Sequence, residues 1–344
     1  MPETLAVGIV GAGTIGRVHA RAIAGLDGVR VAAIAEPQET VGRELASEAG
    51  AEWRSSLEDL LNDSVDIVVL ATPSGLHPDQ AVAAAKAGKH VVTEKPMAIT
   101  AEGASAMIDA AQAHGVTLAV IFQNRFSPDT IKLKHAVDAG MLGRLILGNA
   151  FVHWHRSDDY YAASGGWRGT WALDGGGALI NQSIHTIDLL QWMMGDVASI
   201  AAHTATLTHH IEAEDTASAS LRFRSGALGT IQGTTSAAAD YPVRVELIGD
   251  RGRAILDSGV LTHWDAPDQP GDELLTDDDR AILEGWHPNE DFGDSHRRQL
   301  GQIFAAIRKG SEAPLPGREA RKAVDIILGI YESAREGRRI DLSS

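Results

Sequence analysis

The segment Gly11-Ala12-Gly13-Thr14-Ile15-Gly16 constrains the fold most, because it lies between an apolar run, Leu5–Val10, and a helical pattern. In that context each glycine has its own physical reason. The first permits a tight turn, the second lets the backbone approach a pyrophosphate, and the third lets the helix pack closely on the strand. The following helix offers free N–H groups and the positive end of its dipole to phosphate. The motif alone is weak evidence, but its position between a strand and a helix predicts a dinucleotide-binding βαβ unit, with Gly11, Gly13, Thr14, Ile15 and Gly16 at the cofactor.

An acidic residue stands where such a unit requires one. Glu36 follows the second apolar run, Val29–Ala35, and lies 20 residues after Gly16. A carboxylate at this point accepts hydrogen bonds from the adenosine ribose hydroxyls. It also repels a 2′-phosphate, and the next two residues, Pro37 and Gln38, supply no compensating cation. We therefore expect NAD rather than NADP.

Strand and helix patterns alternate over the first 122 residues. The expected strands are 5–10, 29–35, 66–71, 91–93 and 117–122, and the expected helices are 14–26, 37–49, 57–61, 77–87 and 101–114. Gly88 is the expected C-cap of the fourth helix. Alternation of this kind predicts a parallel sheet with helices on both faces, so residues 1–123 are assigned to a Rossmann domain.

The pattern changes after about residue 124. We expect a helix at 131–139, a long strand at 144–156, and a helix at 181–194. Further strands are expected at 200–208, 215–224, 227–235, 243–249 and 252–257, a long loop at 265–291, and final helices at 295–309 and 318–336. Runs of strands joined by short turns favour an antiparallel sheet. The chain is thus predicted to be an α/β protein. Its second domain, 124–344, is α+β with a large, mostly antiparallel open sheet, and its C-terminal helices are candidates to pack back on the Rossmann domain.

Composition excludes several classes of function. A chain of 344 residues is too long for one typical core. The net charge of −16 argues against a nucleic-acid-binding surface, and the absence of cysteine excludes disulfides, thiolate zinc sites and a cysteine nucleophile. No apolar run approaches the ~20 residues that span a bilayer. Residues 1–4 lead directly into a strand without the pattern of a signal peptide, so a cytoplasmic location is expected.

Lys95 is the first candidate for proton chemistry. It follows an apolar strand in the segment Val91-Val92-Thr93-Glu94-Lys95-Pro96. A lysine beside a nicotinamide can exchange a proton with an alcohol while hydride moves to the cofactor. Lysine normally titrates near 10.4, so it needs burial or a nearby cation to act as a base at neutral pH. The alternative is a solvated lysine at the end of a strand.

A second candidate cluster follows the glycine triplet Gly175-Gly176-Gly177. Asn181, His185 and Asp188 have i, i+4, i+7 spacing and fall on one face of the expected helix. An adjacent row of isoleucines at 180, 184 and 187 provides the face that serves the core. A histidine begins near pKa 6.5, which suits general acid–base catalysis. The alternative is a satisfied histidine on a core helix.

The histidine and aromatic side chains of residues 153–168 could contact a substrate, or they could serve a metal site or the core. His153 and His155 share one face of the expected strand, but no other histidines have matching ligand spacing, so we expect no metal. His155 fits better as a ligand of a substrate hydroxyl. Tyr160 and Trp167 are candidates to line a sugar pocket, because flat aromatic faces suit the C–H-rich faces of sugars, but they fit a core equally well.

The cofactor loop, the Glu94-Lys95-Pro96 segment and the triplet with Asn181 and His185-Thr186-Ile187-Asp188 together resemble the glucose–fructose oxidoreductase/inositol dehydrogenase (Gfo/Idh/MocA) family. The resemblance covers nearly the whole chain, including Thr72-Pro73, Gln123-Asn124-Arg125-Phe126, Trp167-Arg168-Gly169 and Ile330-Tyr331-Glu332-Ser333. The family acts on sugars, inositols, nucleotide sugars and dihydrodiols, so the resemblance does not specify one substrate.

The resemblance implies roles for individual residues. Lys95 and His185 would flank the reacting C–OH, with Asn181 as the third catalytic residue. The implied cofactor-binding residues outside the glycine loop are Glu36, Thr72, Pro73, His77, Glu94, Lys95, Asn124, Trp167 and Arg168. The implied substrate residues are Arg125, His155, Tyr160 and Asp188. The family commonly has Asp where this chain has Asn181, and a neutral amide cannot hold a proton or stabilise an imidazolium by charge, so the proton chemistry falls more heavily on His185 and Lys95.

Three functions are compatible with these residues. The first is an NAD-dependent dehydrogenase of a sugar or cyclic polyol. The second uses tightly bound NAD transiently, to cleave a glycosidic bond or interconvert two sugars. The third is a cofactor-binding sensor without catalysis, and the presence of Lys95 and His185 counts against it. The family resemblance also implies a homodimer or homotetramer that assembles through the open sheet of the second domain.

Overall fold

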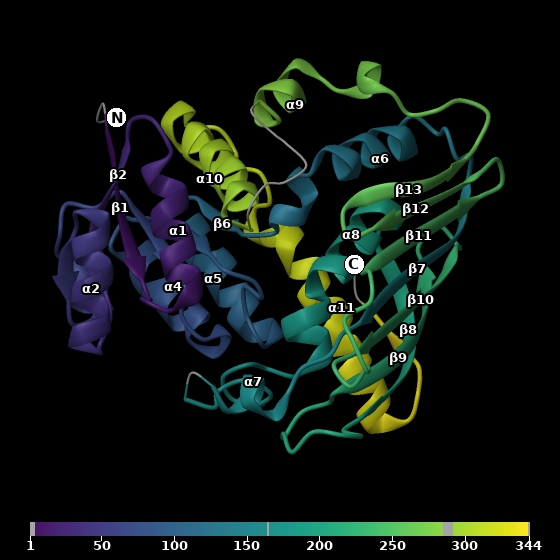
Figure 1. Ribbon diagram of the computed structural model, residues 1–344, viewed down its shortest axis with the longest axis horizontal. Helices are drawn as coiled ribbons and strands as arrows, with labels where there is room; N and C mark the ends of the chain where they lie inside the picture. Colours follow the sequence, from purple (N-terminus) through teal and green to yellow (C-terminus); the bar gives the residue numbers. More distant parts are fainter. Residues whose placement is uncertain (1–3, 164, 285–291, 343–344) are drawn as a thin grey trace. The chain divides into compact units, whose positions relative to one another are not determined.

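The computed structural model describes residues 4–163, 165–284 and 292–342 (Figure 1). The chain divides into two compact units. The first comprises Met1–Gln123 and Gly285–Ala320, and the second comprises Asn124–Glu284 and Arg321–Ser344. Within the described residues, no helix has the length and hydropathy needed to cross a membrane.

The first unit contains a six-stranded sheet in which all pairings are parallel. Its order is β3-β2-β1-β4-β5-β6. The strands are β1 (Leu5–Val10), β2 (Val29–Ala35), β3 (Glu52–Arg54), β4 (Ile67–Leu70), β5 (His90–Thr93) and β6 (Leu118–Val120). All residues of β1 and β4 are buried, as expected for central strands covered on both sides. The strand order reverses direction at β1, and right-handed crossovers then place helices on both faces.

The helices of this unit follow the strands closely. They are α1 (Thr14–Ala24), α2 (Glu39–Ala49), α3 (Leu57–Leu61), η1 (Ser74–Leu76), α4 (His77–Lys86), α5 (Ala101–Ala113), η2 (Gln123–Phe126, which crosses into the second unit) and α10 (Phe292–Lys309). Thr100 caps α5 by accepting the N–H of Gly103, and Gly50 ends α2 with φ 63°. Although far away in sequence, α10 packs against α1, and its Leu300, Ile303 and Phe304 join the core of the parallel sheet.

The second unit is built on an eight-stranded sheet of order β13-β12-β11-β7-β10-β9-β8-β14. Its strands are β7 (Leu145–His153), β8 (Val197–Ala205), β9 (Thr216–Phe223), β10 (Leu228–Thr234), β11 (Arg244–Gly249), β12 (Arg253–Asp257), β13 (Val260–Asp265) and β14 (Ile340–Asp341). Among the strand pairs that the described residues form in this sheet, β10 with β7 is parallel and the others are antiparallel. This sheet confirms the predicted mostly antiparallel architecture.

The sheet of the second unit has one covered face. In β9 the residues Ala217, Ala219, Leu221 and Phe223 are buried, whereas Ser218, Ser220 and Arg222 between them are exposed. The remaining helical elements are α6 (Pro128–Asp138), α7 (Asp158–Ala162), the π-helix η3 (Ala178–Ser183), α8 (Ile184–Met194), η4 (Asp272–Leu274), α9 (Asp277–Ile282) and α11 (Gly317–Glu336), whose first turn lies in the first unit. Helix α8 packs on β7, where Gly148 lies against Met194.

Several elements differ from the sequence-based expectation. The expected strand 144–156 ends at His153, and His155 forms only an isolated bridge with Ser236. The expected loop 265–291 contains η4 and α9, whose start in an acidic run is stabilised by a capping box between Thr276 and Asp279; residues 285–291 lie outside the described residues. Strands β3, β13 and β14 were not expected. β3 and β14 are too short for a readable period, and β13 has no buried residue that would mark a face turned to the core. The cap of α4 is Ala87, one residue before Gly88.

Candidate active site

The glycine loop of the first unit has the geometry of a dinucleotide site. Gly11 has φ +100°, and a Cβ there would lie 2.6 Å from the carbonyl oxygen of Ala71. A Cβ at Gly16 would lie 2.1 Å from the carbonyl oxygen of Gly11. At Gly13, by contrast, a Cβ would meet nothing within 4 Å. The first and third glycines are therefore required by close packing, and the second faces open space at the N-terminus of α1, where a pyrophosphate fits.

Glu36 lies beside this loop. Its carboxylate accepts hydrogen bonds from the backbone N–H groups of Ala12, at 3.0 Å, and Gln38, at 3.1 Å. Among the described residues, it has no lysine or arginine partner. A carboxylate held at the end of β2 in this way fits a ribose diol and disfavours a 2′-phosphate.

The buried side chain of Glu94, which directly follows β5, lies close to two buried histidines. Its Oε1 lies 2.8 Å from Nε2 of His19 on α1 and 3.7 Å from Nε2 of His296 on α10. Burial opposes ionisation, but the His19 hydrogen bond and the positive charges of His19, His296 and Lys95 outweigh it and lower the pKa of Glu94 to about 2. This carboxylate was expected to bind cofactor. Its observed partners tie the Lys95 segment to α1 and α10, and its contact with the cofactor stays a prediction.

His77 connects two loops of the first unit. Its ring is buried, with Nδ1 2.9 Å from the carbonyl oxygen of Pro96 and Nε2 3.0 Å from that of Thr72. Burial is the largest influence on this ring and lowers the pKa of His77. A direct cofactor contact was expected of His77. The neutral ring donates its one N–H to one of these carbonyls, and its position between them connects the Thr72-Pro73 turn to the segment that carries the half-buried Lys95. The cofactor contact stays a prediction.

In the second unit, the glycine triplet lies against a buried acid. A Cβ at Gly176 would be 2.1 Å from the Tyr331 hydroxyl, and one at Gly177 would be 2.0 Å from the Glu214 carbonyl oxygen. The Glu214 carboxylate accepts the N–H groups of Gly177, at 3.0 Å, and Leu179, at 2.8 Å, and the Tyr331 hydroxyl at 3.0 Å. Burial raises the pKa of Glu214 to about 7 against the opposing effect of these bonds. The triplet thus exists because Glu214 and Tyr331 pack directly against the start of η3.

Asn181 sits in η3 within a network of side chains. Its Nδ2 donates to Asp174 at 2.6 Å, and its Oδ1 accepts from Gln182 Nε2 at 2.9 Å and from the Tyr160 hydroxyl at 3.3 Å. Gln182 also donates to the Tyr160 hydroxyl at 2.6 Å. The guanidinium of Arg168 lies 4.5 Å from the Tyr160 ring centroid. The structure therefore brings together three residues predicted for the site, Asn181, Tyr160 and Arg168.

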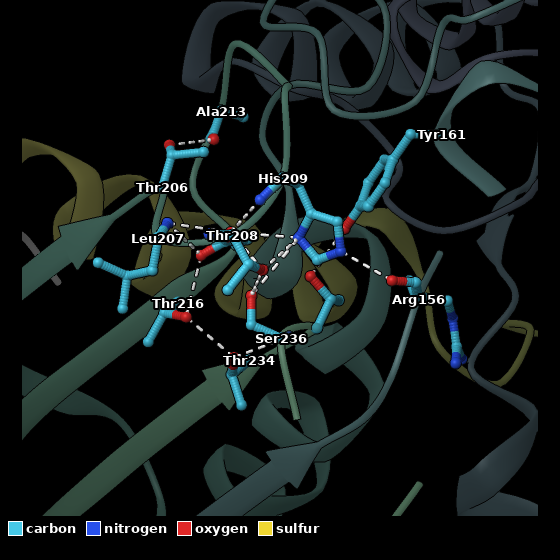
Figure 2. Close-up of polar contacts among 12 residues, drawn as sticks. Arg156, Tyr161, Thr206, Leu207, Thr208, His209, Ala213, Thr216, Thr234 and Ser236 are labelled. Atoms are coloured by element: carbon cyan, nitrogen blue, oxygen red, sulfur yellow. Dashed lines mark hydrogen bonds and ion pairs between the residues drawn. The ribbon is translucent and has the colours of Figure 1, made fainter. Parts of the chain in front are cut away.

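Asp215, the neighbour of Glu214, organises the loop shown in Figure 2. It accepts the N–H groups of Leu207, Thr208 and His209 at 2.8–3.0 Å. Burial opposes ionisation, but these backbone bonds outweigh it and lower the pKa of Asp215. His209 lies between two acceptors, with Nδ1 3.1 Å from Asp215 and Nε2 2.7 Å from the carbonyl oxygen of Arg156. This chain of bonds fixes the segment that leads into α7, which carries Tyr160.

Arg125 and Asp188, both predicted to contact substrate, form a bidentate ion pair with each other. The Nε and Nη2 atoms of Arg125 lie 2.7 and 2.6 Å from the two carboxylate oxygens of Asp188, and both side chains are buried. The guanidinium also lies 4.7 Å from the Trp192 ring centroid. In such a bidentate pair each side chain orients the other. The substrate role expected of Arg125 and Asp188 stays a prediction.

The comparisons with known proteins agree with this architecture. Residues 5–122 match the model of an oxidoreductase family with an NAD-binding Rossmann fold, and residues 130–255 match the GFO/IDH/MocA C-terminal domain. The chain belongs to the GFO/IDH/MocA family of oxidoreductases. The predicted family, the Rossmann fold, the NAD cofactor and the assignment as an NAD-dependent dehydrogenase are thereby confirmed.

Three relatives indicate the range of the family. A WlbA dehydrogenase from Bordetella pertussis, solved with NADH and UDP-GlcNAcA, is 35% identical, with 99% of each chain covered and a TM-score of 0.88. The inositol 2-dehydrogenase 2 of Saccharopolyspora erythraea is 30% identical over 72% of each chain. The myo-inositol 2-dehydrogenase of Thermotoga maritima is 27% identical over 98% of each.

The remaining predicted residues of this family member lie in varied surroundings. His185 is half-buried at the second position of α8, and Trp167 is half-buried beside Arg168. His155 is exposed, with Nδ1 3.0 Å from the carbonyl oxygen of Ala237. Asn124 is exposed, and its carbonyl accepts the Ser127 hydroxyl at 3.3 Å. Among the described residues, no cluster of acidic and histidine side chains could hold a metal ion.

Sequence reasoning missed several polar residues that support the site. They are His19, Asp174, Gln182, His209, Glu214 and His296. Asp174 carried a weak local signal, because it directly precedes the triplet. Gln182 and His209 have partners close in sequence, Asn181 and Asp215, but neither pair forms a recognisable motif. The partners of His19, Glu214 and His296 are distant in sequence, as with His19 and Glu94 at a separation of 75 residues, so no local period reveals them.

Proposed function

We propose that this NAD-dependent dehydrogenase oxidises a CH–OH group of a sugar or cyclic polyol. The observation that supports it most is the fixed polar cluster of Asn181 and Gln182 in η3 with Tyr160 of α7, in which Asn181 lies four residues before His185. Hydroxyl-rich substrates are recognised by amides and aromatic rings held in fixed orientations.

When bound, NAD supplies the acceptor for the hydride. The open backbone at Gly13 and the N-terminus of α1 would hold its pyrophosphate, and Glu36 would accept hydrogen bonds from its adenosine ribose. In the proposed reaction His185 would accept the proton of the substrate hydroxyl as the C–H bond gives up its hydride. An imidazole suits this transfer because histidine ordinarily titrates close to neutral pH. Lys95, as a cation, polarises the hydroxyl.

The relatives narrow the substrates worth testing. The Bordetella pertussis WlbA structure holds UDP-GlcNAcA, and the Thermotoga maritima relative is a myo-inositol dehydrogenase. UDP-GlcNAcA and myo-inositol each have a ring with several CH–OH groups, and the proposed polar cluster would recognise such hydroxyls. We therefore propose myo-inositol, scyllo-inositol, common aldoses and UDP-linked sugars, including UDP-GlcNAcA, as the test panel.

The direct test follows NADH absorbance with this panel. At least one compound should give steady turnover, with kcat/KM higher for NAD than for NADP. Lys95→Ala and His185→Ala should each lower kcat by about 10²- to 10⁴-fold, the usual contribution of a positioned acid or base. Full turnover in both variants would refute the assigned roles. Substrate consumption without net NADH would instead favour the glycosidase or sugar-interconverting alternative.

We further propose that the chain forms a homodimer or homotetramer through the uncovered face of the eight-stranded sheet. Exposed small and polar residues of β9, together with exposed Leu228 on β10, offer a flat surface for a second copy. Light scattering of the wild type and of Ser220→Arg tests this. A monomer in the wild type, or an unchanged oligomer in the variant, contradicts the proposed interface.

A further inference from the structure

Asp174 is a fully buried carboxylate whose two oxygens have different partners. Its Oδ2 accepts the backbone N–H of Gly169 at 2.8 Å, and its Oδ1 accepts the side-chain amide of Asn181 at 2.6 Å. The second distance is short for an N–H···O bond, as is typical when the acceptor is charged. The Gly169 bond closes the turn that leads into the glycine triplet, so the carboxylate is held on a fixed backbone.

The opposite end of the Asn181 amide is equally constrained. Its carbonyl oxygen accepts from Gln182 Nε2 at 2.9 Å and from the Tyr160 hydroxyl at 3.3 Å. An amide has one accepting end and one donating end, and its two orientations are chosen by the network around it. Here a carboxylate, which only accepts, lies at one end, and donors lie at the other. The orientation of Asn181 is therefore determined by Asp174.

We propose that Asp174 is a positioning residue, whose carboxylate locks the orientation of the Asn181 amide and places a negative charge one hydrogen bond behind it. Its consequence for catalysis rests on the proposed function, in which His185, one helical turn after Asn181, accepts a proton. A buried negative charge favours the imidazolium that this transfer creates. Asn181 alone cannot supply such a charge.

The hydrogen-bond inventory predicts what Asp174→Asn does. An amide at position 174 has one acceptor, whereas Gly169 and Asn181 both present donors to it. Either the Gly169 N–H loses its partner, or Asn181 inverts and turns its NH₂ group toward the donors of Gln182 and Tyr160. Both outcomes break bonds that the native carboxylate makes together.

Asn181→Asp has the opposite defect. Two carboxylates would lie at the present 2.6 Å separation and would have to share a proton. The double substitution Asp174→Asn/Asn181→Asp repairs both defects. The new amide at position 174 accepts from Gly169 and donates to the new carboxylate at position 181, which still accepts from Gln182 and Tyr160. The charge and these four bonds, to Gly169, between positions 174 and 181, to Gln182 and to Tyr160, are preserved, and the donor and acceptor exchange places in the bond between positions 174 and 181.

Two measurements test the proposal on the full-length protein. The first is NMR of asparagine-selectively ¹⁵N-labelled protein, in which the Asn181 side-chain amide is identified by its loss in Asn181→Asp. In the wild type one of its protons should be shifted downfield by the charged acceptor, and in Asp174→Asn that shift should disappear. The second is the pH profile of kcat and KM with the panel compound that turns over, assayed for both single variants and the double variant.

The kinetic expectation separates positioning from folding. Asp174→Asn should lower kcat by about 10- to 100-fold, the effect of one charged hydrogen bond, with a much smaller change in KM. The double variant should recover most of the loss. Asp129→Asn is the matched control, because Asp129 accepts the N–H of Leu261 at 2.9 Å in the same unit but has no bond to the Asn181 cluster. It should leave kcat and the pH profile unchanged.

Distinct results overturn the proposal. Identical Asn181 amide signals in the wild type and Asp174→Asn would show that Asp174 does not set the orientation. Loss of the signal shift without any change in kcat or in the pH profile would show that the orientation has no catalytic role. Failure of the whole panel to turn over would refute the proposed function, and the NMR result would then decide the positioning role by itself.

Discussion

Replacing Glu214 by glutamine should remove a pH-dependent loss of stability. The carboxyl is buried, and its pKa is raised from 4.5 to about 7. As pH rises between these values, the unfolded chain releases this proton while the folded chain retains it, so rising pH favours unfolding. From about pH 5 to about pH 8, this one group should lower the free energy of unfolding by about 2.5 kcal/mol. Glutamine does not titrate and should show no such contribution.

The assay is urea unfolding of the wild type and Glu214→Gln at four pH values, followed by tryptophan fluorescence. Trp171 is a suitable reporter, because its ring lies 5.2 Å from the ring of Tyr331, a partner of Glu214. Glutamine leaves one N–H of the triplet without an acceptor, which costs about 1–3 kcal/mol at every pH. The difference in stability between the two proteins should therefore narrow as pH rises. The control variant is Glu212→Gln. Because Glu212 is exposed, this variant should keep the pH dependence of the free energy of unfolding seen in the wild type. A constant difference between wild type and Glu214→Gln would refute the reasoning.

Three further outcomes follow from the geometry. Gly13→Ala should change the free energy of unfolding by less than about 0.5 kcal/mol, yet weaken NAD binding measured by calorimetry. Gly16→Ala should lower the free energy of unfolding of the first unit by about 1–3 kcal/mol, because its Cβ would lie 2.1 Å from the carbonyl oxygen of Gly11. Arg125→Leu should cost about 3–5 kcal/mol in urea unfolding by removing the guanidinium that pairs with the buried Asp188, and adding Asp188→Leu should recover most of that loss. The pKa of Glu94 is lowered from 4.5 to about 2, so the ionised carboxylate adds to the free energy of unfolding above about pH 4.5, and this contribution is lost as pH falls toward about 2. In urea unfolding at acid pH, Glu94→Gln should not show this loss of stability.

The parts of the fold and site that the sequence predicts are those with a local signal. The limits of β1, β2 and α3 were predicted to the residue, because an apolar run or a short helix flanked by turn residues is complete within one window. The cofactor loop was predicted for the same reason. Its three glycines meet only their own loop or the adjacent strand end at Ala71.

Side-chain partners were predicted poorly because they are chosen by the tertiary fold. Asp188 has helical spacing to His185, which suggested one functional face, but its partner Arg125 lies 63 residues away. The glycine triplet was recognised as a motif without its cause, since the acid that packs against it, Glu214, is 37 residues from Gly177. Asn181 looked like the loss of a carboxylate until the fold placed Asp174 against its amide.

The adjacent acids Glu214 and Asp215 show how one point of the fold can fix two functional segments. Both side chains are buried, yet the pKa of Glu214 is raised to about 7 while that of Asp215 is lowered. Asp215 accepts three successive backbone N–H groups of its loop, a concave arrangement that stabilises negative charge, and Thr208 and Thr216 hydroxyls add to it. Glu214 accepts two backbone N–H groups and the hydroxyl of the buried Tyr331. Glu214 holds η3, and Asp215, through His209, holds the segment before α7. The positions of Asn181 and Tyr160 therefore depend on the same two residues, which directly precede β9, and a change in either acid should disturb the Asn181–Tyr160 contact.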